Sequence, residues 1–171
     1  MLLALIWTGG ETPSEGEREA LAQAGRYIAA GGHALLLPAS GGPAILAAES
    51  YRGAGGRHLA GLFPEGSPAP PPALFHETEP AASRAELPEA VARRADALLF
   101  LGPPDASHLA AARAAGKPAW AIGPQARGPV PGLRLLPDAG AFARELAKLF
   151  SRSIVSRRDP LAKRQKGGDR P

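Results

Sequence analysis

The sequence predicts a single α/β domain of Rossmann-like, three-layer architecture, with a mostly parallel sheet and helices on both of its faces. A length of 171 residues is enough for one domain with a core and too short for two domains of ordinary size. Apolar runs without polar alternation, at residues 2–7 and 96–101, are typical of strands covered on both faces. Segments of helical composition alternate with such runs, as in proteins built from strand–helix–strand units.

The first part of the chain is expected to form three strands separated by two helices. Residues 2–7 form the first strand, and the turn at residues 8–10 ends it. The next helix begins near Pro13 and Ser14, because acidic residues follow them near the positive end of the helix dipole, and it ends at two glycines, 31 and 32. The remaining elements expected here are a strand at 33–37, a helix from Pro43 to the glycines at 53–56, and a strand at 58–63.

The second part contains more proline. Five prolines within residues 64–72 predict a stiff, exposed connection. A segment of helical composition at 81–95 contains Pro88, which is expected to kink or split the helix because proline lacks an N–H donor. The other expected elements are a short strand beginning within 75–80, strands at 96–101, 119–122 and 132–136, and helices at 106–115 and 139–150.

The charge distribution divides the chain into a domain at residues 1–150 and a basic tail at 151–171. The tail has seven basic and two acidic side chains, a net charge of +5, whereas residues 1–150 have 13 basic and 14 acidic side chains, a net charge of −1. The tail has no aromatic residue that could stack on a base, so a disordered end is expected and nucleic acid is not an expected partner. Contact with an anionic partner is the alternative.

The composition argues against several classes of protein. The chain has no cysteine, which excludes disulfides, thiolate metal sites and thiol catalysis. Its four histidines are not close to one another in sequence, so no metal centre is expected. No apolar stretch approaches the roughly 20 residues of a membrane span, and no signal sequence is visible at the start. We therefore expect a soluble, cytoplasmic protein without contact to a membrane.

The turn between residues 35–37 and the following helix is the strongest candidate for a binding site. The residues Ser40, Gly41, Gly42 and Pro43 lie between an apolar run and an alanine-rich helical segment. A glycine-rich turn at a helix N-terminus presents free N–H groups and a positive dipole end, which suit a phosphate. The alternative is that the two glycines only allow the chain to turn.

Two further small-residue turns also follow predicted parallel strands, so they are expected at the same edge of the sheet. Ligands of such sheets collect at this edge, at the carboxyl ends of the strands. One contains Gly9 and Gly10, and the other contains Gly102, Asp105 and Ser107. The three turns together predict a pocket for an anion or a nucleotide. The first turn reads T-G-G-E-T-P and not G-x-G-x-x-G, so no nicotinamide cofactor, and no other cofactor, is expected.

The order of these features resembles the Lonely Guy family, long labelled putative lysine decarboxylases, within a superfamily that includes molybdenum cofactor carrier proteins. Residues 40–48, followed by Arg52-Gly53-Ala54 and by 60–64, look like the family's G-G-G-P-G-x-M-x-A turn, its helix and the next strand ending in proline. Residues 96–102 and Gly116-Lys117-Pro118 look like its fifth strand and the G-K-P after the following helix. The resemblance covers residues 1–123.

The resemblance implies a Rossmann-like homodimer that binds a nucleoside monophosphate such as AMP. It also implies a phosphoribohydrolase, which cleaves the N-glycosidic bond of AMP or of a cytokinin riboside monophosphate. The family's P-G-G-x-G-T-x-x-E motif supplies phosphate donors and a catalytic glutamate. Here the corresponding segment begins at Gly102, contains Pro103 and Pro104, and has His108 where the glutamate would lie. Arg84 is the nearest candidate for the family's catalytic arginine.

Several alternatives remain for these residues. His108 is either a general acid or base or a residue that packs on the first turn of its helix, and Asp105 is either a ligand contact or an N-cap. Arg84 is either catalytic or solvated, and Glu77 is a candidate replacement for the missing glutamate. Trp7 is expected in the core or at a dimer contact. The alternatives to a hydrolase are a carrier or sensor of a phosphorylated ligand and a structural dimer whose pocket has decayed.

Overall fold

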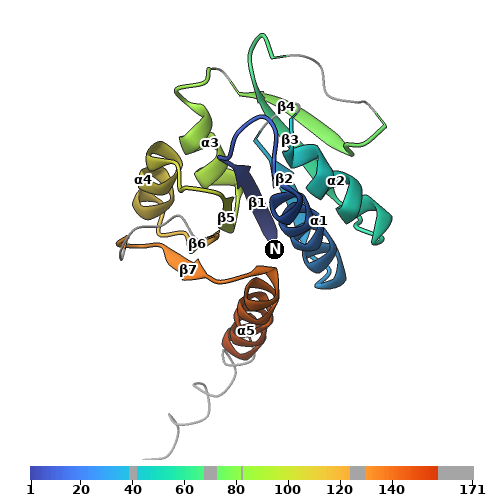
Figure 1. The fold of residues 1–171 in the computed structure, drawn as a ribbon. Helices are drawn as coiled ribbons and strands as arrows, with labels where there is room; N and C mark the ends of the chain where they lie inside the picture. The colour runs from blue at the N-terminus through green and yellow to red at the C-terminus, as the bar shows by residue number, and fades with distance from the viewer. Residues whose placement is uncertain (39–41, 68–72, 82, 124–129, 158–171) are drawn as a thin grey trace, which may run out of the picture.

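A computed structural model describes residues 1–38, 42–67, 73–81, 83–123 and 130–157, and the side chains of these residues up to Lys148. The chain folds into a three-layer α/β domain (Figure 1). Its elements are β1 (Leu2–Trp7), α1 (Glu15–Ala30), β2 (Ala34–Leu37), α2 (Ala44–Gly53), β3 (Leu59–Pro64), β4 (Glu77–Ala81), α3 (Leu87–Arg94), β5 (Ala97–Leu101), α4 (Ala106–Ala114), β6 (Ala119–Ile122), β7 (Arg134–Leu136) and α5 (Ala139–Arg157).

The seven strands form one sheet in the order β4-β3-β2-β1-β5-β6-β7, and every pairing between neighbours is parallel. The chain moves outward from β1 to β4 and then returns to β5 on the other side of β1. The switch in strand order therefore lies between β1 and β5, which is where ligands of such sheets collect. The predicted fold class is confirmed.

Helices cover both faces of the sheet, and a separate hydrophobic core lies on each face. Helix α1 contacts α2 and α5, whereas α3 contacts α4 (Figure 1). Along β1, Leu3 and Leu5 pack in one core while Ala4 and Ile6 pack in the other. Successive side chains of a strand point to opposite faces, so burial on both faces explains the uninterrupted apolar runs.

Three helices begin with a side-chain cap, as their sequences indicate. In α1, Ser14 and Glu17 form a capping box, in which each side chain bonds the backbone N–H of the other residue. Asp105 caps α4. Asp138 Oδ1 accepts the N–H of Ala141 at 2.7 Å at the start of α5. These caps satisfy N–H groups that the first turn of a helix leaves without partners.

The prediction for residues 81–95 was wrong. Ala81 is the last residue of β4, and α3 begins only at Leu87. Pro88 lies at the N-terminus of this helix, where the missing N–H costs nothing because it would have no partner within the helix. The proline therefore helps to start a short helix and does not kink a long one.

The C-terminal helix is longer than the sequence pattern predicts. Helix α5 runs to Arg157, whereas a helix ending at residue 150 was expected, and residues 158–171 lie outside the described part. Within the described ranges, no helix combines the length and the apolar character needed to cross a membrane.

Candidate functional site

The turns after β1 and β5 touch each other at the carboxyl edge of the sheet. The N–H of Thr8 donates to the carbonyl of Leu101 at 3.1 Å. Gly102 has φ +101°, and a Cβ at this position would lie 3.0 Å from the backbone nitrogen of Gly9. Glycine is therefore required at residue 102 by both its conformation and the close approach of the two turns.

A small cavity of about 230 Å³, called here the histidine cavity, opens beside these turns. The residues that line it come from the end of β1, the end of β2, the start of α2 and the start of α4. They are Leu5, Ile6, Trp7, Thr8, Pro38, Ala44, Asp105 and His108. The cavity therefore lies where the three predicted turns were expected to meet.

Asp105 and His108 form a hydrogen-bonded pair in this cavity. The Oδ1 atom of Asp105 accepts the backbone N–H of His108 at 2.8 Å and lies 2.7 Å from Nδ1 of its ring. Burial alone would raise the pKa of Asp105, but the hydrogen bonds from His108 and its charge outweigh burial and hold this pKa below its usual value. Asp105 is thus both the N-cap of α4 and a carboxylate that orients the imidazole.

The other ring nitrogen of His108 has no hydrogen-bond partner among the described residues. The Nε2 atom is buried, and the side chain is 13% exposed. A carboxylate at Nδ1 favours the tautomer with the proton on Nδ1, which leaves a lone pair on Nε2. His108 is therefore prepared to accept a hydrogen bond or a proton from a bound molecule.

The structure brings only some of the predicted binding residues together. Gly9 and Gly102 touch each other, and Asp105 and His108 line the histidine cavity. Gly10 is exposed, and Ser107 is exposed beside the groove between α3 and α4.

The second predicted turn is described only in part. Gly42 is exposed with φ +73°, and Pro43 is the N-cap of α2. Ser40 and Gly41 lie outside the described residues. The binding role of all these residues stays a prediction.

Arg84 is not among the residues that line the histidine cavity. It is exposed in the connection between β4 and α3. Its neighbour Ala85 lines the groove between α3 and α4 together with Ser107, the residue before His108. The catalytic role of Arg84 therefore stays a prediction.

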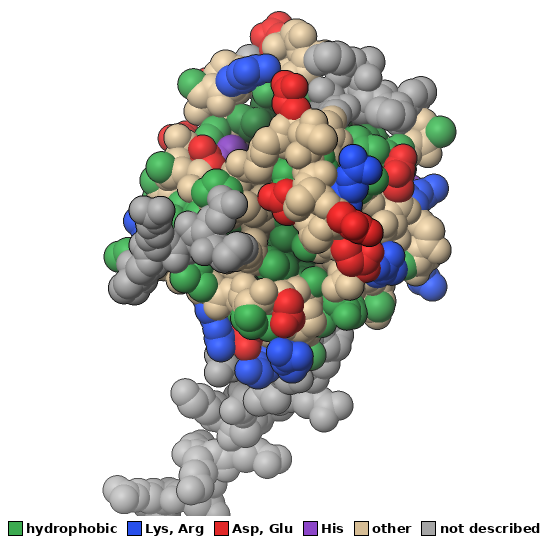
Figure 2. Space-filling model, in the orientation of Figure 1, with side chains coloured by type: hydrophobic (Ala, Val, Ile, Leu, Met, Phe, Trp, Pro, Cys, Tyr) green, Lys and Arg blue, Asp and Glu red, His purple; other side chains and the backbone are tan. Residues whose placement is uncertain are grey.

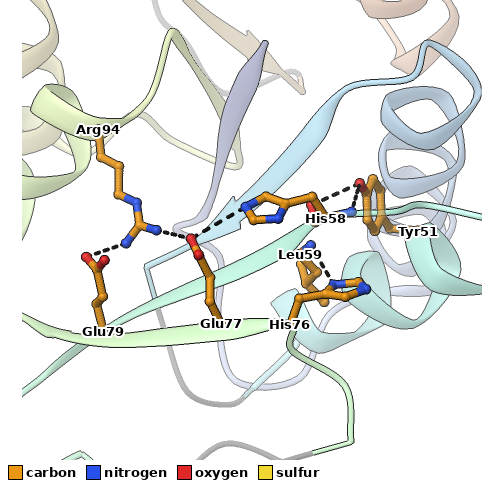
Figure 3. A network of polar contacts seen from close by, with 7 residues as sticks. All are labelled: Tyr51, His58, Leu59, His76, Glu77, Glu79 and Arg94. Carbon is orange, nitrogen blue, oxygen red and sulfur yellow. Dashed lines mark hydrogen bonds and ion pairs between the residues drawn. The ribbon is translucent and has the colours of Figure 1, made fainter.

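A second polar cluster lies at the opposite, amino edge of the sheet (Figure 3). Arg94 forms ion pairs with both Glu77 and Glu79 of the edge strand β4. The Nδ1 atom of His76 accepts the N–H of Leu59 at 2.9 Å. The interpretation of Glu77 as a substitute for the missing glutamate is wrong, because Glu77 starts β4 at the far end of the sheet and is paired with Arg94. The cluster fastens the edge strand to β3 and α3.

A second, larger cavity, and the position of Trp7 beside it, escaped the sequence reasoning. This cavity, called here the α1–α5 cavity, has a volume of about 650 Å³ and lies at the carboxyl edge between the N-terminal ends of α1 and α5. Trp7 is only partly buried and lines both cavities. The sequence offered one signal, an aromatic residue at a strand end, followed by Thr8 and two glycines.

Both cavities are acidic. Asp105 lines the histidine cavity, and Glu17, Glu19 and Asp138 line the α1–α5 cavity, whereas neither lining includes a described lysine or arginine. Hydrogen bonds from the side chain and backbone of Ser14 hold the pKa of Glu17 below its usual value, so this carboxylate is ionised at neutral pH. In the described part of the chain, no three histidine or acidic side chains are grouped closely enough to hold a metal ion.

Comparisons with known proteins identify the fold. No protein-family model matches the chain, and no curated protein matches it in sequence. Among solved structures, the molybdenum cofactor carrier protein of Chlamydomonas reinhardtii has 20% identity and a TM-score of 0.72, over 88% of this chain and 98% of that one. The molybdenum cofactor binding protein of Rippkaea orientalis has 14% identity and a TM-score of 0.64, over 90% of this chain and 96% of that one.

The same fold also occurs in a protein of another class. DNA processing protein A from Helicobacter pylori, described with a single-stranded DNA binding mode, has 14% identity and a TM-score of 0.64, over 86% of this chain and 80% of that one. The likenesses confirm the Rossmann-like fold of this chain. The superfamily relation and the narrower assignment to the Lonely Guy family stay predictions.

Proposed function

We propose that this chain binds a small molecule at the carboxyl edge of its sheet and acts as a carrier or sensor of a phosphorylated ligand. The observation that carries the proposal is the buried Nε2 atom of His108, which has no described partner and belongs to a residue lining the histidine cavity. A buried polar atom without a partner costs about 1–3 kcal/mol, so a ligand that pairs with it recovers this free energy. The carrier proteins that share the fold support a binding role.

The start of α2 supplies a place for the phosphoryl group. This helix has no side-chain cap and no acidic residue in its first turn, unlike α1, whose Ser14 and Glu17 form a capping box. The positive end of its dipole is therefore not compensated by a described side chain. Ala44, its first residue, lines the histidine cavity, so a phosphoryl group there would lie at the helix end. The one carboxylate in this lining, Asp105, is already paired with His108.

A phosphoribohydrolase is the second candidate, and the Asp105–His108 pair favours it. An imidazole held by a carboxylate at Nδ1 can take a proton at Nε2 from an attacking water. In this mechanism His108 would take over the task of the family's glutamate, and Asp105 would orient it. The part of Arg84 in this reaction stays a prediction, because Arg84 does not line the histidine cavity.

Calorimetry with AMP, ribose 5-phosphate and inorganic phosphate tests the binding proposal, and chromatography of the same AMP samples detects free adenine. Binding without base release supports a carrier or sensor, and base release supports the hydrolase. His108→Ala should weaken binding, whereas Ala110→Ser, an exposed change on the same helix, should not. If none of the three compounds binds, the proposed phosphorylated ligand is wrong. The predicted homodimer and cytoplasmic location need separate measurements.

A further inference from the structure

The α1–α5 cavity has the shape and the chemistry of a second binding site. It lies on the α1 and α5 side of the sheet, and its apolar part is formed by Trp7, Ala20, Leu101, Ile122 and Ala139. Figure 2 shows a hollow near the middle of the molecule, with hydrophobic side chains in its floor and acidic side chains around it. The volume of about 650 Å³ lies within the range of small-molecule sites.

The indole of Trp7 is held in one orientation at this cavity. Its Nε1–H donates to the carbonyl of Gly10 at 3.1 Å. A Cβ on residue 9 would lie 2.2 Å from Cζ2 of the same indole, so the ring rests against backbone that only glycine leaves open. The chain thus fixes a partly exposed aromatic ring with its polar atom already satisfied. Such a ring offers a surface on which a planar ligand can stack.

Two carboxylates of the cavity are held in place without being neutralised. One oxygen of Glu17, Oε2, accepts both the N–H and the hydroxyl of Ser14, and Asp138 Oδ1 accepts the N–H of Ala141. Neither side chain forms an ion pair with a described basic residue. Each therefore keeps one oxygen available as an acceptor beside the apolar floor. Glu19 differs, because Arg26 pairs with it at 2.7 Å.

We propose that the α1–α5 cavity binds a planar aromatic heterocycle that carries amino groups and no phosphate. The heterocycle stacks on Trp7, and its N–H groups donate to the free carboxylate oxygens of Glu17 and Asp138. Neutral or cationic heterocycles fit this arrangement, because the negative charge of the cavity repels a phosphate. The proposal does not rest on the histidine cavity, because the two linings share no residue except Trp7.

Tryptophan fluorescence of the full chain tests the proposal, with adenosine as the probe. The chain has two tryptophans, and Trp120 is buried at 4% exposure. Adenosine should quench the emission of Trp7, and the quenching should be lost in Trp7→Phe, where Trp120 still reports an intact core. Ribose, which has no heterocycle, should leave the emission unchanged. Absence of quenching by adenosine, or equal quenching in Trp7→Phe, would overturn the proposal.

Two ligand comparisons test the predicted chemistry. Inosine, which lacks the amino group of adenosine, should bind about three- to tenfold more weakly, as expected for the loss of a hydrogen bond. AMP should quench Trp7 less than adenosine at equal concentration, and added salt should reduce the difference by screening the phosphate from the carboxylates. Equal affinity for all three compounds would contradict recognition by the carboxylates.

Two variants remove charge without removing a helix cap. Asp138→Asn retains a good N-cap, and Glu17→Gln retains the capping box, so both should fold normally. Each should weaken adenosine binding and narrow the gap between adenosine and AMP. Glu19→Gln, at the carboxylate already paired with Arg26, serves as the matched control and should have a smaller effect.

A failure of this second-site proposal can be distinguished from a failure of the proposed function. His108→Ala should leave quenching by adenosine intact while weakening the binding of ribose 5-phosphate, which contains no heterocycle. If adenosine quenching falls with His108→Ala, the heterocycle occupies the histidine cavity and the second site is excluded. If ribose 5-phosphate fails to bind and adenosine still quenches Trp7, the proposed phosphorylated ligand fails while the second site stands.

Discussion

A single oxygen of Asp105, Oδ1, accepts a hydrogen bond from the backbone N–H of His108 at 2.8 Å and lies 2.7 Å from Nδ1 of the same residue's ring. The same carboxylate therefore starts α4 and selects the tautomer of the residue three positions later. The side chain of Asp105 therefore both stabilises α4 and orients the imidazole of His108.

This relationship predicts how stability depends on pH. The pKa of Asp105 is lower in the folded protein than in the unfolded chain, so its stabilising contribution is present above the unfolded pKa and is lost as pH falls through the folded pKa. Urea unfolding across the acidic range should show this loss in the original chain and less of it in Asp105→Asn. An identical acid profile in the two proteins would contradict the assignment.

Replacement of the cap should separate its two roles. Asp105→Ala removes the N-cap and should lower the free energy of unfolding by about 1 kcal/mol, whereas Asp105→Asn, which can still cap, should lower it less. Nitrogen NMR of the His108 ring should show the proton on Nδ1 in the original chain and a larger fraction on Nε2 in Asp105→Ala. A tautomer unchanged by this substitution would show that the carboxylate does not orient the ring.

Gly9→Ala should displace the indole of Trp7. The new Cβ would meet Cζ2 at 2.2 Å, so the ring or the turn must move, at a cost of about 1–3 kcal/mol. Gly10→Ala is the matched control, because a Cβ at residue 10 would have no atom within 4 Å in the described part of the chain. Urea unfolding gives the free energies, and Trp7 emission should shift in the first variant alone.

Two glycines of α1 should respond in opposite directions to alanine. A Cβ at Gly25 would lie 2.2 Å from the backbone oxygen of Ala47, so Gly25→Ala should force α1 away from α2 and destabilise the fold by several kcal/mol, roughly the upper range for overpacking. No described atom lies within 4 Å of a Cβ at Gly16, and Gly16→Ala should stabilise the helix by about 0.5–1 kcal/mol. Thermal unfolding of both variants checks the contrast; destabilisation by Gly16→Ala would show that its small size is needed for another reason.

Tyr51→Phe should destabilise the junction of α2 and β3. The buried hydroxyl lies 2.9 Å from the carbonyls of His33 and His58 and accepts the N–H of His58 at 3.1 Å. Removal of the hydroxyl deletes these hydrogen bonds to the backbone, at a cost of about 1–3 kcal/mol. Tyr27→Phe, at a side chain 38% exposed, should change the free energy of unfolding by less than about 0.5 kcal/mol. Equal effects of the two variants on urea unfolding would contradict this account.

Local chemistry made much of the fold predictable. The uninterrupted apolar run of β1, the start signals at Ser14 and the cap at Asp105 act within a few residues, so their effects can be recognised without the tertiary structure. The prediction at Pro88 failed because proline can either interrupt a helix or occupy its first turn. Here β4 takes up the chain as far as Ala81, so the helix begins only at Leu87 and Pro88 lies in its first turn. Sequence proximity does not reveal that Glu77, at the start of β4, lies at the opposite edge of the sheet from the turn that contains His108.

The candidate site was less predictable than the fold. Position in the motif predicted that His108 lies in the site, and its bond to Asp105 is local, but the burial of Nε2 depends on residues of β1, β2 and α2 that line the same cavity. The α1–α5 cavity is formed by residues that lie far apart in the sequence, from Trp7 to Ala139. No local pattern could have indicated its volume.

Trp7 belongs to the linings of both cavities, and its indole is fixed by the hydrogen bond to Gly10 and the contact with Gly9. The two cavities therefore share one rigid wall. Because coupling between two sites requires an element that changes between two arrangements, we expect a molecule in either cavity to leave the affinity of the other unchanged.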